Sequence, residues 1–243
     1  MGLICIPTNM IVAGHQPNFF PWFGFFEKII KSHIFVFSDD VQYPKQSYTN
    51  RTLIPIQTIE SYVTLPVKQK GYEDQISKKV YLKDKKIIKK IYSNFYFNLC
   101  KLNYFSDIED ILEEFKIDYW NLSTISELNI KTILNICEKL NLNNTNFKKG
   151  TELNLDKYNK NDRLIERCRK LDCYNYLCGQ GADGYQDEEY LRKNKINLIK
   201  IDYDIGNKIF HGDIKYSILY VISKYGLEKI KQAIVKYNEN IVH

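Results

Sequence analysis

Apolar and polar positions alternate near the start of the chain in a pattern that predicts strand, helix and strand. Residues 10–14 form an apolar run long enough for one buried strand, and residues 33–38 form a second. Between them, residues 22–31 carry an apolar stripe at helical spacing, just after Pro17 and Pro21 interrupt regular structure. Strand, helix and strand within about 30 residues predict a βαβ unit, in which the two strands run parallel.

The rest of the chain continues this alternation around a helical middle. Helical periodicity marks residues 84–99, 106–117, 124–140, 162–170 and 187–194, and two further helices are predicted from Ile214 and from Leu227. Strand character marks residues 51–56, 61–67, 174–178 and 197–203. Ser106 and Thr124 each stand three residues before a Glu, the pattern of a capping box at a helix start.

These segments together predict an α/β fold with a parallel-sheet core built from βαβ units and a helical middle segment. We expect a single domain over residues 1–243, in which residues 83–145 form a helical insertion or subdomain. The clearest polar loop is predicted at residues 141–146.

Composition narrows the class of protein. The 243 residues are 44% hydrophobic with only 11 Gly and 6 Pro, which excludes a disordered or collagen-like chain. No apolar run approaches the ~18–20 residues of a membrane-spanning helix. The net charge of +6 suits an anionic ligand but is weaker than the clustered basic surface of a nucleic-acid-binding protein. The densest basic stretch, residues 78–90, opens a predicted helix and fits a solvated face, so we expect no nucleic-acid partner.

The cysteines and the N-terminus indicate a reducing compartment. The six cysteines contain no CxxC pair, and the start of the chain lacks the basic and apolar regions of a signal peptide. We therefore expect a cytoplasmic protein with free, mostly buried thiols, without a resident cofactor. The oligomeric state is left open.

Polar residues cluster where the first two predicted strands end. His15, Gln16 and Asn18 follow the first strand, and Asp40 and Gln42 follow the second. Open parallel sheets bind ligands at the carboxyl edge of their strands, so these residues are predicted to share a site. Histidine suits proton transfer near neutral pH, and the surrounding aromatic residues can wall a pocket or stack on a sugar ring. The alternative is a rigid turn with packed aromatics and one hydrogen-bonded His.

The segment after the second strand adds candidates for binding. Lys45 and Arg51 can bind phosphate or carboxylate, and Asn50 can hydrogen bond to a substrate. Asp39 and Asp40 should point to opposite faces, so that only one reaches the site. Together with His15 they could coordinate a cation, but they lack the spacing of a metal site, so we assign no metal and leave metal dependence open. The alternative is an exposed polar loop with surface ion pairs.

A third candidate is the glycine-rich run from Gly179 through Gly181 to Gly184 after a predicted strand. It formally matches a dinucleotide-binding pattern, but the following helix is short and the unit lies near the C-terminus, which disfavours a nicotinamide or flavin site. A loop whose backbone N–H groups approach an anion or substrate fits better. Cys178 just before it fits a small buried thiol better than a nucleophile.

The sequence resembles the WbqC-like protein family in long collinear runs. These are GHQPNFFPWFGFFEKI (14–29), FVFSDDVQYPKQSYTNR (35–51), YVTLPVK (62–68), YLCGQGADGY (176–185) and YSILYVISKYG (216–226). The motif positions carried over are His15, Gln16, Pro17, Pro21, Asp40, Gln42, Asn50, Arg51, Gly179, Gly181 and Tyr185. The family usually has Ser at the position of Cys178, which argues against a required thiolate there.

The resemblance implies a role in making bacterial surface polysaccharides, such as the O-antigen of lipopolysaccharide. We expect a transferase acting on a nucleotide-sugar or amino-sugar, for example in acyl or aminoacyl transfer. His15 would act as general base, and Asp40 would orient His15 or hold a substrate hydroxyl. The residues expected to bind substrate are Gln16, Asn18, Gln42, Lys45, Asn50, Arg51, Gly179, Gly181 and Tyr185. A hydrolase using the same pocket and a non-catalytic glycan or nucleotide-sugar binding protein are the alternatives.

Overall fold

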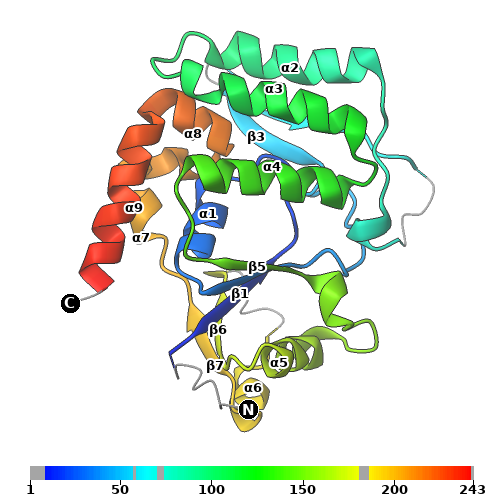
Figure 1. The fold of residues 1–243 in the computed structure, drawn as a ribbon, viewed down its shortest axis with the longest axis vertical. Coiled ribbons are helices and arrows are strands. Elements are labelled where there is room, and N and C mark those ends of the chain that lie inside the picture. Colours follow the sequence, from blue (N-terminus) through cyan, green and yellow to red (C-terminus); the bar gives the residue numbers. More distant parts are fainter. Residues whose placement is uncertain (1–8, 57–58, 70–73, 181–185, 242–243) are drawn as a thin grey trace. The chain divides into compact units, whose positions relative to one another are not determined.

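The chain forms two compact units, each assembled from separate stretches of sequence. The computed structural model describes residues 9–56, 59–69, 74–180 and 186–241 (Figure 1). The first unit comprises Met1–His15, Lys28–Asp40 and Asn144–Asp202, and the second comprises Gln16–Glu27, Val41–Asn143 and Tyr203–His243. The boundary between Glu27 and Lys28 falls inside helix α1, Phe23–Ile30. The predicted helical insertion, residues 83–145, falls largely within the second unit, and the single-domain organisation stays a prediction.

The first unit is built on a five-stranded parallel sheet. Its strands are β1 (Ile11–His15), β2 (Ile34–Phe37), β5 (Asn146–Lys149), β6 (Asn175–Cys178) and β7 (Asn197–Lys200). They lie in the order β5-β2-β1-β6-β7, and every neighbouring pair is parallel. The predicted α/β class with a parallel-sheet core is confirmed. The chain runs from β1 outwards to β2 and β5 and then returns to β6 on the other side of β1. The strand order therefore reverses between β1 and β6, at a topological switch point.

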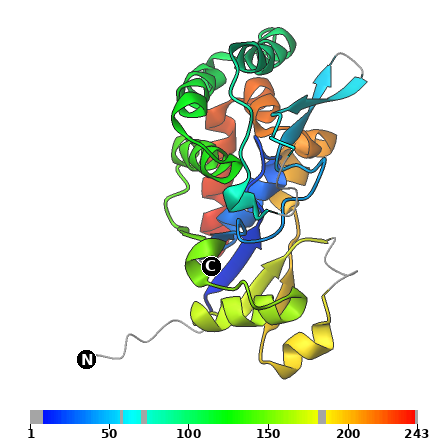
Figure 2. The ribbon, with the colours of Figure 1, turned by 90° about the vertical axis from the view of Figure 1, so that its right-hand side faces the viewer.

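Two helices cover one face of this sheet. Helix α5 (Lys160–Lys170) and helix α6 (Glu188–Lys193) lie side by side in Figures 1 and 2. Leu164 and Ile165 of α5 pack with Val12 of β1 and Val36 of β2 in one hydrophobic core. Because side chains alternate along a strand, Gly14 lies on the same face of β1 as Val12. This places the end of β1 against α5.

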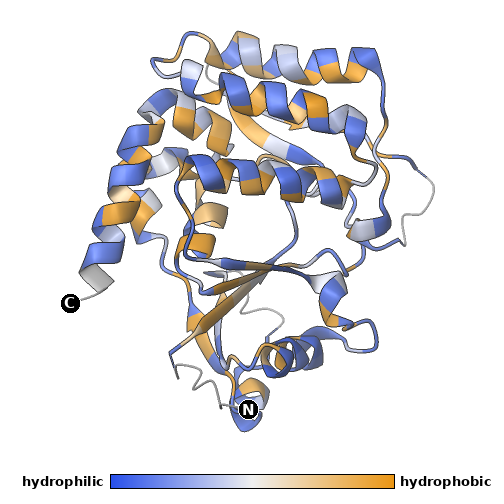
Figure 3. Ribbon diagram, viewed as in Figure 1, coloured by the Kyte–Doolittle hydropathy of each residue, from blue (hydrophilic) through white to orange (hydrophobic). Residues whose placement is uncertain are grey.

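The second unit packs helices with a two-stranded hairpin. Strands β3 (Arg51–Ile56) and β4 (Ile59–Thr64) form an antiparallel ladder. The longer helices are α2 (Lys85–Leu99), α3 (Ser106–Asn121), α4 (Ile125–Lys139), α8 (Ile218–Tyr225) and α9 (Leu227–Ile241). Figure 3 shows hydrophobic and hydrophilic residues alternating along α2, α3 and α4, as amphipathic packing requires. Across the described ranges, no helix combines the length and the hydropathy needed to cross a bilayer.

Several boundaries differ from the predicted ones, each for an identifiable reason. Strand β5 was not predicted, because its sequence NFKK is polar and it lies at the edge of the sheet. The strand predicted over 197–203 ends at Lys200, and helix α7 (Asp204–Phe210) begins four residues later. The last two helices begin at Ile218 and Leu227, and the start predicted at Ile214 lies in the 3₁₀ turn His211–Lys215.

The two predicted capping boxes have opposite outcomes. At Thr124 the box is present, since the Glu127 N–H donates to the Thr124 hydroxyl over 3.2 Å and the Thr124 N–H donates to the Glu127 carboxylate over 2.9 Å. At Ser106 the prediction is wrong. Phe105 precedes the helix there with helical backbone angles, and no side chain caps it.

A buried carboxylate fixes the start of α7 in the second unit. Glu27 is fully buried, and its two oxygens accept the backbone N–H groups of Ile205 and Gly206 at 3.0 and 2.9 Å. These N–H groups have no partner within the helix itself, so the carboxylate satisfies donors that would otherwise be buried without one.

We expect Glu27→Gln to lower the free energy of unfolding by about 1–3 kcal/mol, because a neutral amide replaces a charged acceptor of two buried N–H groups. Urea denaturation followed by circular dichroism measures the change. The matched control is Glu113→Gln on α3, where the carboxylate is exposed and bonds to Lys116. It should change stability by less than about 0.5 kcal/mol. An equal effect of both substitutions would contradict the role of Glu27.

Candidate functional site

The carboxyl edge of the first unit's sheet gathers a group of buried polar residues at the switch point. We define the switch-point cluster as Gly14, Lys28, Ser38, Arg167 and Tyr176. They come from β1, α1, the end of β2, α5 and β6. The ends of strands β1 and β2 are joined by a hydrogen bond in which the Ser38 N–H donates to the His15 carbonyl over 2.8 Å. This is the edge at which the sequence predicts a ligand site.

Arg167 crosses this edge from α5. Only 5% of the residue is exposed. Its guanidinium donates to the Ser38 hydroxyl over 3.0 Å and to the Tyr176 hydroxyl over 3.4 Å, and its Nε is buried without a hydrogen-bond partner in the described part of the chain. A Cβ added at Gly14 would lie 2.2 Å from a terminal nitrogen of Arg167. Glycine at this position therefore makes room for the guanidinium.

Lys28 reaches the same edge from α1. It is also only 5% exposed, and its Nζ donates to the Gly14 carbonyl over 2.9 Å. Burial lowers the pKa of Lys28 to about 8; the nearby Cys178 opposes this shift and the positive charge of Arg167 adds to it. Within the residues that the structure describes, no carboxylate forms an ion pair or hydrogen bond with Lys28 or Arg167. The cluster thus carries two buried cations whose hydrogen-bond acceptors among the described residues are all uncharged oxygens.

The adjacent carboxylates Asp39 and Asp40 take separate partners. Asp39 accepts the backbone N–H of Thr151 at 2.9 Å and its hydroxyl at 3.2 Å, and burial raises the pKa of Asp39. Asp40 forms an ion pair with Arg163 of α5, and its Oδ1 is buried without a hydrogen-bond partner among the described residues. A Cβ at Gly150 would lie 2.1 Å from that oxygen, so the glycine admits the carboxylate.

The residues predicted to form the site divide between the two units. His15, Asp40 and Gly179 lie in the first unit. Gln16, Asn18, Gln42, Lys45, Asn50 and Arg51 lie in the second. Gly181 and Tyr185 fall outside the described residues. The carboxylate of Asp40 bonds to Arg163, so its orienting role towards His15 stays a prediction.

Backbone-directed hydrogen bonds order the predicted residues of the second unit. Asn129 of α4 is buried and donates to the carbonyls of Pro17 and Thr49 at 2.9 and 2.7 Å, which ties the loop after β1 to the loop before β3. The Thr49 hydroxyl donates to Gln16 over 3.5 Å. The Asn50 amide donates to the Leu65 carbonyl over 3.1 Å, so part of its capacity supports the fold.

The remaining candidates of the second unit differ in exposure. Gln42 and Lys45 are exposed, whereas Asn18 is buried. The Arg51 guanidinium lies 4.2 Å from the centre of the Tyr62 ring, within cation–π range. The exposed aromatic pair Tyr48 and Tyr62 lies beside it, with ring centres 6.3 Å apart.

Two aromatic residues predicted beside the site pack in the core instead. Phe19 and Phe20 are buried, and their rings lie 5.8 and 4.9 Å from that of Phe115. Phe20 also lies 5.1 Å from Phe95. The idea that they wall a pocket is wrong for these two rings, because α2 and α3 fold over them.

Lys28, Arg167, Arg163 and Asn129 were not predicted as site residues. A signal for Arg167 exists in the sequence: it stands three residues after Leu164 and next to Cys168, on the apolar stripe of its helix. Lys28 likewise interrupts the apolar run FGFFEKII of α1. A charged residue on an apolar helical face indicates either a buried partner or a ligand.

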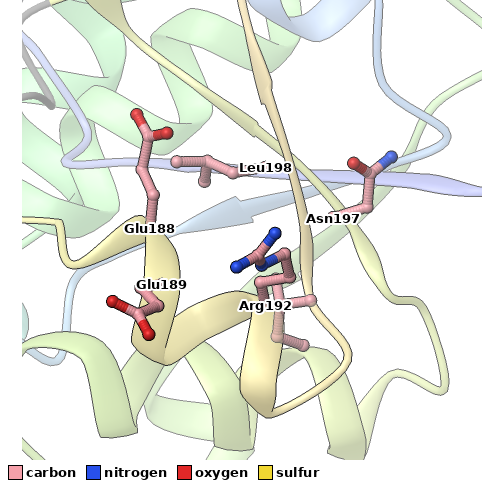
Figure 4. Close-up of a pocket in the computed structure, with 6 residues that line it drawn as sticks. Glu188, Glu189, Arg192, Asn197 and Leu198 are labelled. Atoms are coloured by element: carbon pink, nitrogen blue, oxygen red, sulfur yellow. The ribbon is translucent and has the colours of Figure 1, made fainter.

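The surface groove drawn in Figure 4 carries no comparable group. It is lined by residues of α6 and β7, among them Glu188, Glu189 and Arg192. Glu188 pairs with Lys200 and Glu189 with Lys193, each at 2.9 Å, and all four side chains are exposed. The charges here are those of a solvated surface.

Comparison with known proteins gives one family and one distant relative. The model of the WbqC-like protein family matches residues 16–214. A protein of Mycobacterium tuberculosis, named uncharacterized protein Rv1507c, is 28% identical over 193 residues, which cover 79% of this chain and 82% of the relative. No solved structure matches the chain.

We expect Gly14→Ala to lower the free energy of unfolding by about 1–3 kcal/mol, because the new methyl group displaces the Arg167 guanidinium. Gly212→Ala is the control, since no atom lies within 4 Å of a Cβ added there. Chemical denaturation should show a smaller cost for Gly14→Ala in an Arg167→Ala background. The same cost in both backgrounds would rule out a clash with Arg167.

Lys28 also predicts a dependence of stability on pH. Because its folded pKa of about 8 lies below the ordinary value of 10.5, the unfolded chain binds more protons between these values, and stability rises with pH there. We expect the wild type to gain stability relative to Lys28→Met between about pH 7 and about pH 10. Denaturation of both proteins, repeated with Cys178→Ser in each to remove the neighbouring thiol, measures the difference. A difference that is constant or falls with pH contradicts the prediction.

Proposed function

The chain belongs to the WbqC-like protein family, and from this premise we propose that it is a cytoplasmic enzyme of bacterial surface-glycan biosynthesis. In this proposal it transfers an acyl or aminoacyl group to a nucleotide-sugar or amino-sugar of an O-antigen-type polysaccharide. The family supports the glycan context, and the site supports a small-molecule ligand.

One observation supports placing the ligand site at this edge of the sheet. The strand order reverses between β1 and β6, and open α/β sheets bind ligands in the crevice beside such a reversal. The loop that begins at His15 leaves β1 at this edge, and Gly179 directly follows β6. Two of the motifs shared with the family, those of His15 and of Gly179, thus begin at the two strands that flank the reversal.

His15 is proposed as general base. Its imidazole would take a proton from the sugar amine or hydroxyl while that group attacks the acyl carbonyl of the donor. The new N–C or O–C bond forms as the bond between the carbonyl carbon and the leaving group breaks. The proton then passes to the leaving group, and His15 returns to its neutral form.

The other predicted residues would hold the substrate. Asp40 has a buried carboxylate oxygen without a hydrogen-bond partner in the described part of the chain, which suits a role in accepting a sugar hydroxyl. Gln16, Asn18, Gln42, Asn50 and Tyr185 would supply hydrogen bonds, Lys45 and Arg51 would bind an anionic group, and the backbone at Gly179 and Gly181 would approach the ligand closely.

A non-catalytic glycan or nucleotide-sugar binding protein is the second candidate. It is favoured by the engagement of both carboxylates at this edge, Asp39 with Thr151 and Asp40 with Arg163. Ligand-induced stabilisation without turnover would support this candidate. A hydrolase would instead release the free acid and be indifferent to an amine acceptor.

We expect His15→Ala to slow turnover by about 10²–10⁴-fold, because the general base is lost, while the melting temperature stays close to that of the wild type. Small molecules that copurify with the protein identify the substrate, and mass spectrometry of products with and without an amine acceptor measures transfer. His211→Asn, at an exposed position outside the proposed site, is the control. Wild-type turnover of His15→Ala would remove His15 from the mechanism.

A further inference from the structure

We infer that Lys28 and Arg167 form a binding site for a phosphate group at the topological switch point between β1 and β6. The inference rests on the proposed function only for the carrier of that phosphate, because a nucleotide-sugar brings such a group to this edge. It assigns a ligand chemistry to two residues that are not among the motif positions carried over from the family.

Lys28 and Arg167 are buried without a negatively charged group in contact among the described residues. Both cations are 95% buried by residue area, since 5% of each is exposed. Burying an unpaired ion costs several kcal/mol even after the protein relaxes, so buried charges are normally paired. Here the hydrogen-bond acceptors among the described residues are the carbonyl of Gly14 and the hydroxyls of Ser38 and Tyr176. None of these carries a negative charge, and the described residues supply no carboxylate to either cation. The ionisable neighbour of Lys28 is the Cys178 thiol, which is neutral in its ordinary protonated form. A permanently charged anion is the group that these two side chains lack.

Lys28 and Arg167 also have more hydrogen-bond donors than their neighbours accept among the described residues. An ammonium group has three N–H bonds, and the Gly14 carbonyl accepts one from Lys28. A guanidinium has five, of which Ser38 and Tyr176 accept one each from Arg167, while its buried Nε–H has no partner in the described ranges. The Ser38 hydroxyl accepts from Arg167 and keeps its own hydrogen to donate. Phosphate, with several acceptor oxygens, matches this excess of donors.

The charge of the two side chains favours phosphate over a metal ion or a carboxylate as the ligand. Two cations repel a metal ion, and a carboxylate neutralises only one of them. A phosphate monoester dianion neutralises both, and so does the diphosphate of a nucleotide-sugar, which carries one negative charge on each phosphate. Arg binds phosphate through two parallel N–H groups, and Lys adds a point charge. The absence of a side chain at Gly14, which admits the guanidinium, keeps Arg167 at the strand ends rather than at the surface.

The competing explanation is that both cations are structural, with Arg167 joining β2 to β6 and Lys28 satisfying a carbonyl at the end of β1. The two explanations differ in what phosphate does. A structural role predicts that substitutions at Lys28 change stability equally with and without phosphate, whereas a binding site predicts that the response to phosphate itself is lost.

The test measures the melting temperature and calorimetric binding of the full chain with inorganic phosphate, at an ionic strength held constant with potassium chloride. We expect a saturable rise in melting temperature for the wild type. Lys28→Met should weaken phosphate binding by about 10- to 100-fold, because hydrogen bonds to a charged group are lost. Arg167→Lys keeps the charge but loses the two parallel N–H groups of the guanidinium, and it should also weaken phosphate binding. This variant provides the test if Lys28→Met does not fold. Arg192→Gln, which removes an exposed charge of the same unit, should bind like the wild type.

Further ligands identify the source of the phosphate. A nucleoside diphosphate and a sugar 1-phosphate are compared with inorganic phosphate, and acetate serves as the carboxylate. Tighter binding of either organic phosphate supports the site and names its carrier. Three outcomes overturn the inference: no stabilisation of the wild type beyond potassium chloride, an unchanged response in both Lys28→Met and Arg167→Lys, or acetate binding as well as phosphate. His15→Ala should bind phosphate normally, so a failure of the proposed transfer reaction is distinguishable from a failure of this site.

Discussion

One buried guanidinium connects the strands on which the first unit depends. Arg167 extends from α5 over the strand ends, bonds to Ser38 after β2 and to Tyr176 of β6, and passes the face of β1 at Gly14. It can do so because the strand order reverses beside β1, so that α5 lies against the strands on both sides of the reversal. A side chain at position 14 would exclude it. The glycine of β1 and the arginine of α5 are therefore parts of one constraint.

The buried acidic and basic groups at this edge have different kinds of partner. Asp39 accepts hydrogen bonds from Thr151 of the 3₁₀ turn Gly150–Leu153. Asp40 forms an ion pair with Arg163 of α5. Lys28 and Arg167 find only uncharged oxygens among the described residues. The first unit therefore buries Lys28 and Arg167 without a carboxylate in contact among the described residues, alongside the buried carboxylates Asp39 and Asp40. In the second unit neutral amides such as Asn129 position the loops, while the buried Glu27 carboxylate orders the start of α7.

The predicted parts of the fold are those in which local pattern and final environment agree. The apolar runs before His15 and Ser38 became parallel strands because a strand buried on both faces needs apolar side chains throughout. Strand β5 escaped prediction because an edge strand can be polar, and the Ser106 cap failed because Phe105 already has helical backbone angles. The position of His15 at the carboxyl edge of the sheet was predictable from the parallel geometry alone. The roles of Lys28 and Arg167 were not predictable, since a single charged residue on an apolar helical face does not indicate which groups its side chain contacts.

The sequence by itself determined the α/β class, the parallel sheet and membership of the WbqC-like protein family, because these follow from periodicity and from long contiguous motifs. Only the tertiary structure decided which aromatics are core, with Phe19 and Phe20 covered by helices far away in the sequence. It also decided which charges are compensated. Charge compensation depends on distances between residues such as Asp40 and Arg163, which lie more than a hundred positions apart and meet only when α5 packs against the sheet.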